Sequence, residues 1–170
     1  MSQPLEPRQL AFRNAMAQMS AAVSVVTSDG EAGRCGITAT AVCSVTDAPP
    51  TVLVCVNRGS AMNAVFKANG WLCINILASE QEETARHFAG MTGVAMDERF
   101  ALAGWTTSSA GLPVLEGALA NLQGRLVEVQ EVGTHSVLLV ALDEIRVREE
   151  GDSLVYFSRA FRRVSRGCVA

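Results

Sequence analysis

The sequence is short of charge and of the motifs that mark several functional classes. Charged residues make up 18% of its 170 residues, the net charge is −3, and lysine and arginine form no block, so we expect no nucleic-acid partner. No apolar segment approaches the roughly 18 residues that a membrane-spanning helix needs. The first residues, MSQPLEPRQ, lack the apolar stretch of a signal peptide. These absences predict a cytoplasmic protein that does not bind membranes.

Histidine and paired cysteine, the usual ligands of structural metals, are also scarce. Only His87 and His135 are present, and the odd number of cysteines includes no C-x-x-C pair, so we expect no metal site. Most of the cysteines lie in apolar segments, which is typical of reduced thiols in the core of a cytoplasmic protein. A catalytic Cys–His pair stays open, although no spacing supports one. The cysteines are Cys35, Cys43, Cys55, Cys73 and Cys168.

The nucleotide-binding signatures of parallel α/β proteins are missing as well. No G-x-G-x-x-G follows a predicted strand and no G-x-x-x-x-G-K-[S/T] occurs, which argues against a Rossmann or P-loop protein. Apolar residues, in contrast, are abundant at 49%, and the mean hydropathy is +0.23. A single domain over residues 1–170 can therefore build a full core, and the remaining apolar surface favours an oligomer.

The apolar pattern predicts a mainly β fold. Strand-like segments are joined by hairpin signals such as Asp29-Gly30, and the long crossover helices of parallel sheets are missing, so we expect an antiparallel barrel. The run Val137 to Leu142 is apolar on both faces, so its strand should be central or lie at an interface. The predicted strands span residues 21–28, 36–46, 51–57, 71–77, 118–132, 135–147 and 153–158.

A few short helices accompany these strands. The first is amphipathic, because Phe12, Met16 and Met19 fall on one of its faces. Ser60 is a favoured N-cap residue, and the S-x-x-E pattern at 79–82 predicts a capping box. The arginine-rich end of the chain is expected to form a tail. The predicted helices span residues 6–20, 60–69 and 79–88, with a shorter piece at 96–100 in an otherwise irregular stretch over 91–117.

The segment 36–57 carries many hydroxyl groups for a core strand. Side chains two residues apart share one face of a strand, so the hydroxyls should line one face of 36–46 and apolar side chains the other. A Pro-Pro turn then leads to a nearly continuous apolar strand. This unit is suited to bind a polar ligand on one wall, although a solvated strand face would give the same pattern. The row comprises Thr38, Thr40, Ser44 and Thr46.

Four motifs together resemble the short-chain flavin reductase family, in that family's order, from about Phe12 to Phe161. They are GITATAVCSVTDAPP at 36–50, SAMNAVF at 60–66, ARHFAGMTG at 85–93 and VGTH at 132–135. The resemblance implies a split antiparallel β-barrel of the Greek-key type with short flanking helices, usually a homodimer. It also implies an enzyme that binds FAD or FMN non-covalently, oxidises NADH without a metal, and releases reduced flavin to a separate oxygenase.

The motif variants rank the functions that this resemblance allows. SAMN at 60–63 and HFAGMTG at 87–93 favour a reductase that serves 4-hydroxyphenylacetate 3-monooxygenase, an oxygenase of aromatic compound catabolism. PPTVLVCVNRG at 49–59 is instead close to the flavin reductases of the pyrimidine (uracil) degradation monooxygenase system. The alternatives from another class are a non-catalytic flavin-binding or flavin-storage protein and a split-barrel protein that binds heme or pyridoxamine phosphate.

The resemblance also implies which residues contact the isoalloxazine ring of the flavin. Thr38, Ala39 and Thr40 match the family's segment along this ring, and Ser44 and Thr46 continue the same wall. The small side chain of Ala39 lets the backbone approach the ring.

A second group of residues is expected around the flavin phosphate. Asn57 and Ser60 lie just before a helix whose N-terminus suits a phosphate, and Asn63 lies in its first turn. Arg86 is expected to supply a charged contact and Phe88 to support the pocket. Ser60 as an N-cap alone, and Arg86 as a solvated charge, are the simpler interpretations of these two residues.

The nicotinamide side of the site is carried by His135, the one expected catalytic residue. Relatives have Gly-Asp-His where this chain has Gly133-Thr134-His135, so the resemblance implies NADH binding by the histidine and leaves the carboxylate role without a counterpart. Phe157 and Arg162 resemble a C-terminal segment that closes over the site. A solvated tail or a subunit contact is the alternative for Arg162.

Overall fold

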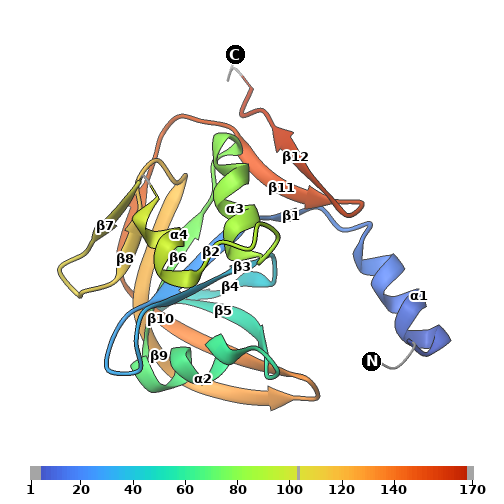
Figure 1. Cartoon of the computed structure of the whole chain (residues 1–170), viewed down its shortest axis with the longest axis horizontal. Coiled ribbons are helices and arrows are strands. Elements are labelled where there is room, and N and C mark those ends of the chain that lie inside the picture. The colour runs from blue at the N-terminus through green and yellow to red at the C-terminus, as the bar shows by residue number, and fades with distance from the viewer. Residues whose placement is uncertain (1–4, 103, 168–170) are drawn as a thin grey trace.

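The computed structural model describes residues 5–102 and 104–167, and its centre is a seven-stranded antiparallel sheet (Figure 1). The edge strands β3 and β4 are consecutive in the chain, so the sheet curls until its two edges face each other across Thr40 and Ala41. This arrangement confirms the predicted antiparallel split-barrel type of fold. In sheet order the strands are β3 (Cys35–Ala39), β2 (Ser24–Ser28), β6 (Trp71–Ile76), β9 (Ala120–Val132), β10 (His135–Val147), β5 (Pro50–Asn57) and β4 (Val42–Asp47).

Two smaller sheets and several short helices surround the main sheet. Helix α2 lies at one end of it, α3 and α4 lie at the other end, and α1 projects away from the body (Figure 1). In the described part of the chain, no helix combines the length and the apolar character needed to cross a bilayer. The small sheets are β1 (Ala21–Ala22), β11 (Ser153–Phe157) and β12 (Ala160–Val164), and β7 (Trp105–Thr107) with β8 (Pro113–Leu115). The helices are α1 (Pro7–Met16), α2 (Ala61–Asn69), α3 (Glu82–Phe88) and α4 (Met96–Ala101), with a 3-10 turn η1 (Ser79–Gln81).

Several local predictions are confirmed. Strand β10 pairs with β5 on one side and β9 on the other, so it is central as its apolar faces indicate. Ser60 is the N-cap of α2 and its Oγ accepts a hydrogen bond from the Met62 amide at 3.3 Å. Gly70 ends this helix with a φ of 69°, a left-handed conformation that glycine adopts without steric cost.

The prediction of one continuous strand over 36–46 is wrong. The chain leaves the sheet at Thr40 and Ala41, and β3 and β4 pair with different neighbours, β2 and β5. The break arises because the chain must pass from one edge of the curled sheet to the other. The hydroxyls therefore do not form a single row, and those of β4 lie on a different edge from those of β3.

Three further predictions need correction at the level of local detail. Before α3, Gln81 Oε1 accepts from the Ala78 amide at 3.0 Å, so the side chain that caps this turn is Gln81 and not Glu82 of the S-x-x-E pattern. The arginine-rich end is not a tail, because it forms β12 against β11. The hairpin β7–β8 lies in the stretch expected to be irregular, since its strands are too short to show a period.

The first helix is confirmed but its expected apolar face is not packed. Helix α1 has no buried residue, and Phe12, Met16 and Met19 are 64%, 45% and 59% exposed. Its orientation is held at one end, where the Ser158 amide donates to the Ala17 carbonyl oxygen at 2.8 Å. The helix is therefore fixed in direction but leaves its apolar side chains uncovered.

The buried side chains form two main clusters. One fills the curled sheet and includes Phe66 of α2, Leu72 of β6 and Leu138 of β10, all fully buried. The other lies under α3 and α4, where the rings of Phe88 and Phe100 meet with centroids 5.0 Å apart. The line along which the free edge of β3 faces β5 and β4, here called the seam, lies between these two clusters.

The cysteines only partly follow the prediction of core thiols. Cys35 and Cys73 are buried, and burial raises the pKa of each thiol to about 12. Cys55 is half-buried, whereas Cys43 is exposed on β4 because that edge strand carries no cover. All four are free thiols, and Cys168 lies outside the described residues.

Candidate functional site

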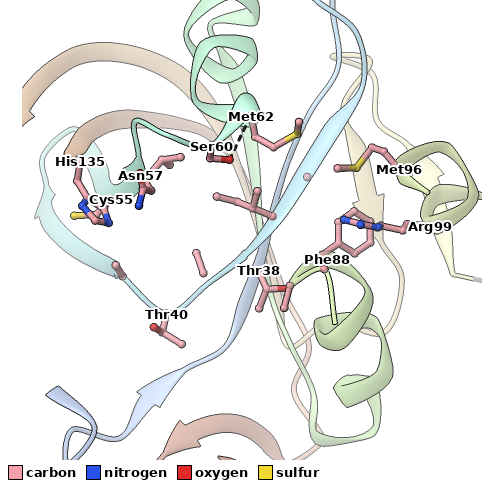
Figure 2. Close-up of a pocket in the computed structure, with 17 residues that line it drawn as sticks. Thr38, Thr40, Cys55, Asn57, Ser60, Met62, Phe88, Met96, Arg99 and His135 are labelled. Carbon is pink, nitrogen blue, oxygen red and sulfur yellow. Dashed lines mark hydrogen bonds between the residues drawn. The ribbon is translucent and has the colours of Figure 1, made fainter. Parts of the chain in front are cut away.

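A cavity lies at the seam where the free edge of β3 approaches β5. Its volume is about 470 Å³, within the range of pockets that hold small organic ligands. Strand β3 and the two residues that follow it, together 36–41, form its floor, and β5, α2, α3, α4 and β10 supply most of the remaining lining (Figure 2). The cavity contains seven of the predicted site residues, namely Thr38, Ala39, Thr40, Asn57, Ser60, Phe88 and His135.

The floor of the cavity combines a free strand edge with small side chains. Strand β3 pairs only with β2 in the described sheet, so alternate backbone amides and carbonyls on its other edge lack a ladder partner. Thr38 Oγ1 donates to the Ala85 carbonyl oxygen at 2.6 Å, which ties β3 to α3. Ala39 is buried and Thr40 is exposed. A flat polar ring can therefore approach this backbone closely and exchange hydrogen bonds with it.

The N-terminus of α2 meets one side of the cavity. Ser60 and Met62 both line it, and Figure 2 shows Ser60 at the point where the helix begins. Before the helix, Asn57 Oδ1 accepts from the Gly59 amide at 2.7 Å, which fixes the turn. Amides and a hydroxyl at the positive end of a helix suit an anionic group such as a phosphate.

Asn63 does not line the cavity but lies behind it. It is 5% exposed, and its Nδ2 donates to the Val56 carbonyl oxygen at 3.1 Å and to Ser136 Oγ at 3.0 Å. These bonds join α2 to β5 and β10. Asn63 therefore sets where α2 begins, and it lies outside the lining of this cavity.

His135 lies at the start of β10, opposite Asn57 of β5 in the strand register. Its ring nitrogen Nδ1 is 2.9 Å from Thr134 Oγ1, so Thr134 orients the imidazole. The ring is exposed at the mouth of the cavity (Figure 2). It can therefore contact a second ligand that stacks on one held against β3.

The charges next to this region are neutralised by Glu131 of β9. Its carboxylate accepts from Lys67 Nζ at 2.6 Å and from Ser136 Oγ at 2.8 Å, and Arg58 Nε lies 3.2 Å away. The hydrogen bond from Lys67, followed by that from Ser136, holds the pKa of Glu131 below its usual range. Arg58 is thereby held outside the cavity lining, although it is next to Asn57 in sequence.

The opposite wall contains residues that the sequence did not indicate. Met96 and Arg99 project from α4 beside Phe88 (Figure 2). Cys55 also lines the cavity, and burial raises the pKa of its thiol, which makes it a poor nucleophile. The short piece predicted at 96–100 is confirmed as α4, but no sequence pattern indicated that its side chains line a cavity.

Five predicted residues are not brought to this cavity. Arg86 forms an ion pair with Glu82 on its own helix and lies over the Phe161 ring. Arg162 lines a second cavity of about 420 Å³ between η1 and β12. The other three are exposed and lie outside the lining, and they are Ser44 and Thr46 of the edge strand β4 and Phe157 of β11.

Two smaller cavities extend the site toward β11. Both share Thr40 with the main cavity and both include Tyr156. The first, of about 180 Å³, is also lined by Thr38 and by apolar side chains such as Val23 and Phe161. The second, of about 230 Å³, reaches Met16 and Met19. An elongated ligand could therefore continue from the main cavity past Thr40.

The lining is suited to position ligands rather than to transfer protons. Within the described lining there is no aspartate or glutamate, and hydroxyls, amides, one imidazole and one guanidinium supply the polar groups. This set fits a flavin, which needs backbone contacts for its ring and amides or hydroxyls for its phosphate. Thr38, Ala39 and Thr40 would hold the ring, and Ser60 would hold the phosphate.

The chain is similar to known flavin reductases over almost its whole length. Residues 16–165 match the flavin reductase like domain family. The sequence is 71% identical over 160 residues to the 4-hydroxyphenylacetate 3-monooxygenase reductase component of Pseudomonas aeruginosa, covering 94% of each chain. It is 46% identical to the FMN reductase (NADH) RutF of Agrobacterium fabrum, covering 92% of this chain and 89% of that one.

The fold is also similar to that of flavin reductases whose structures have been solved. The NADH:FAD oxidoreductase SgcE6 of Streptomyces globisporus superposes with a TM-score of 0.86 at 25% sequence identity, covering 99% of this chain and 100% of that one.

Proposed function

This chain belongs to the flavin reductase like domain family, and from that membership we propose that it is the NADH-dependent flavin reductase of a two-component monooxygenase. It would supply free reduced FAD or FMN to a separate oxygenase component. The observation that carries the proposal is the cavity at the β3–β5 seam, where a free strand edge, a helix N-terminus and His135 meet. We further propose a cytoplasmic location, which the four free thiols support.

The residues of the cavity would act by holding two rings together. Hydride transfer between dihydronicotinamide and flavin is the chemistry of the two rings themselves, so the protein supplies position and exclusion of water. The backbone of residues 38–40 would hold the flavin ring against β3, and Ser60 would bind its phosphate. The absence of a carboxylate from the described lining agrees with a reaction that needs no side-chain acid.

His135 would bind the nicotinamide donor. It lies at the mouth of the cavity, and the contact between its Nδ1 and Thr134 Oγ1 sets the direction of its ring. A protein that only stores flavin has no use for such a group beside the exposed side of the ring. This residue therefore favours the reductase over a non-catalytic flavin-binding protein.

We propose 4-hydroxyphenylacetate 3-monooxygenase as the oxygenase that this reductase serves. The support is the 71% identity to a reductase component of that system, against 46% to RutF. The pyrimidine degradation system is the second candidate. Its motif around residues 49–59 is shared, but the overall identity is lower.

We also propose that the chain forms a homodimer. A helix of ten residues is marginally stable in water when it stands alone, and α1 buries none of its residues. Helix α1 projects from the body in Figure 1, and its Phe12 and Met16 are 64% and 45% exposed. A second copy of the chain would cover these side chains. The high mean hydropathy of the sequence predicts such an oligomer.

The proposed reaction is tested by mixing the protein with NADH and excess FAD or FMN and following absorbance at 340 nm. NADH should be oxidised well above the rate with flavin alone. If the protein binds flavin but NADH is oxidised no faster than without protein, the chain is a flavin-storage protein rather than a reductase. The neighbouring genes distinguish the two partners, because an aromatic hydroxylase gene supports the first candidate and a gene for pyrimidine-ring cleavage supports the second.

A further inference from the structure

Arg99 of α4 lies on the wall of the cavity that faces His135 across the opening (Figure 2). It is the only arginine or lysine within the described lining, and no carboxylate lines the cavity with it. The ion pairs found among the described residues involve other arginines, such as Arg34 with Asp29 and Arg86 with Glu82. Arg99 therefore presents an uncompensated positive charge to the ligand space.

The guanidinium of Arg99 is held in place by its neighbours. Its Nε donates to the Val94 carbonyl oxygen at 2.8 Å, and its Cζ lies 5.9 Å from the centroid of the Phe88 ring. Phe88 in turn packs against Phe100 and Trp105. Because the Nε bond occupies the inner edge of the fork, the two terminal nitrogens remain to bind an anion in a fixed orientation.

We infer that Arg99 binds the diphosphate of a dinucleotide in this cavity, which makes it a specificity-determining residue. The inference rests on the proposed function. The N-terminus of α2 on another side of the cavity already suits one phosphate, so a second anion site on α4 fits a ligand with a further phosphate group. FAD and NADH both carry a diphosphate, whereas FMN carries a single phosphate.

The test compares Arg99→Ala and Arg99→Lys with the parent protein by flavin titration and steady-state kinetics. The alanine variant should weaken at least one dinucleotide about 10-fold, as expected for the loss of a charge-assisted contact, while the dissociation constant of FMN changes less than about 2-fold. A weaker FAD complex assigns the contact to the flavin. A raised KM for NADH, measured with saturating FMN, assigns it to the nicotinamide donor. Lysine keeps the positive charge but lacks the planar guanidinium, so the dinucleotide affinity of Arg99→Lys should lie between those of the parent and Arg99→Ala.

ADP is a further probe, because it carries a diphosphate without either reactive ring. It should compete with the affected dinucleotide in the parent protein and compete less well in Arg99→Ala. The inference is overturned if FAD, NADH and ADP all keep their affinities. It is also overturned if FMN weakens as much as FAD, since that result shows a collapsed wall rather than a lost diphosphate contact.

Arg34→Ala is the matched control. Arg34 lies over the Phe100 ring, 5.6 Å from its centroid, but pairs with Asp29 and lies outside the lining of the main cavity. This variant should leave every affinity unchanged. Thermal unfolding of all variants shows whether the aromatic cluster is intact. The flavin titrations need no turnover, so they test Arg99 even if the parent protein fails to oxidise NADH.

Discussion

Gly36 of β3 lies directly against the ring of Phe88 on α3. A Cβ at position 36 would lie 2.7 Å from Cε1 and 2.8 Å from Cδ1 of that ring, closer than real Cβ atoms approach other atoms. Strand and helix can therefore pack at this distance only because residue 36 has no side chain. Since Phe88 also forms the wall of the cavity under Arg99, the glycine sets the width of the site.

Replacing this glycine tests that relationship. Gly36→Ala should destabilise the protein by about 1–3 kcal/mol, as overpacked cores do, and should weaken flavin binding by displacing the Phe88 ring. Urea unfolding and flavin titration measure the two effects. The double variant Gly36→Ala/Phe88→Leu should recover part of the stability, because the smaller side chain makes room. If Gly36→Ala is as stable as the parent and the double variant gains nothing, the contact does not determine the packing.

His135→Ala should separate the donor from the flavin. We expect the KM for NADH to rise about 10-fold, as for loss of one interaction worth about 1.4 kcal/mol, while the flavin dissociation constant stays within about 2-fold. His87→Ala is the control, because His87 contacts Thr92 at 2.7 Å and lies outside the cavity lining. An unchanged KM for NADH in His135→Ala removes this residue from the donor site.

Ser60 can be tested as a phosphate ligand independently of its role as an N-cap. Ser60→Ala loses both functions and should lower stability and flavin affinity by about 1 kcal/mol each. Ser60→Asp keeps a capping side chain but adds a charge that repels phosphate, so it should stay stable and bind FMN more weakly than the alanine variant. Riboflavin, which has no phosphate, is the control ligand. Equal effects of Ser60→Asp on FMN and riboflavin would show that Ser60 does not face the phosphate.

Phe12 of α1 tests the dimer. Sedimentation or light scattering should find a dimer for the parent chain and a smaller species, or a much weaker dimer, for Phe12→Glu, because a charge would replace the side chain that a second copy covers. Leu102→Glu is a control at a similarly exposed apolar residue outside α1. A parent chain that is monomeric, or a Phe12→Glu dimer as tight as the parent's, contradicts the proposed role of this helix.

The cluster around Glu131 predicts how stability depends on pH. Lys67 and Ser136 lower the pKa of Glu131 in the folded protein, so the ionised carboxylate stabilises the fold above its ordinary pKa of 4.5, and this contribution is lost as the pH falls through the folded value. Glu131→Gln should therefore unfold at a lower temperature than the parent at pH 7. The difference should shrink as the pH falls below 4.5 and also with added salt. A difference that does not depend on pH would mean that packing, rather than charge, explains the effect.

Local chemistry was readable from the sequence wherever a short pattern decides the conformation. Ser60 and Gly70 mark the ends of α2, and the apolar run of β10 indicates a central strand, because caps and side-chain alternation act over a few residues. The same reading failed for β12. Its arginines, Arg162 and Arg163, are typical of a solvated tail, and only the pairing with β11 makes this segment a strand.

The composition of the site depends on contacts between distant parts of the chain. Thr38 and Ser60 reach one cavity, whereas Ser44 and Thr46 do not, because the curled sheet places β3 and β4 on opposite edges. Arg99 enters only because α4 packs on Phe88. Sequence patterns thus determined the ends of elements and the motifs that carry the family likeness. Which side chains share the cavity was decided by sheet closure and helix packing, since these interactions join residues far apart in the chain.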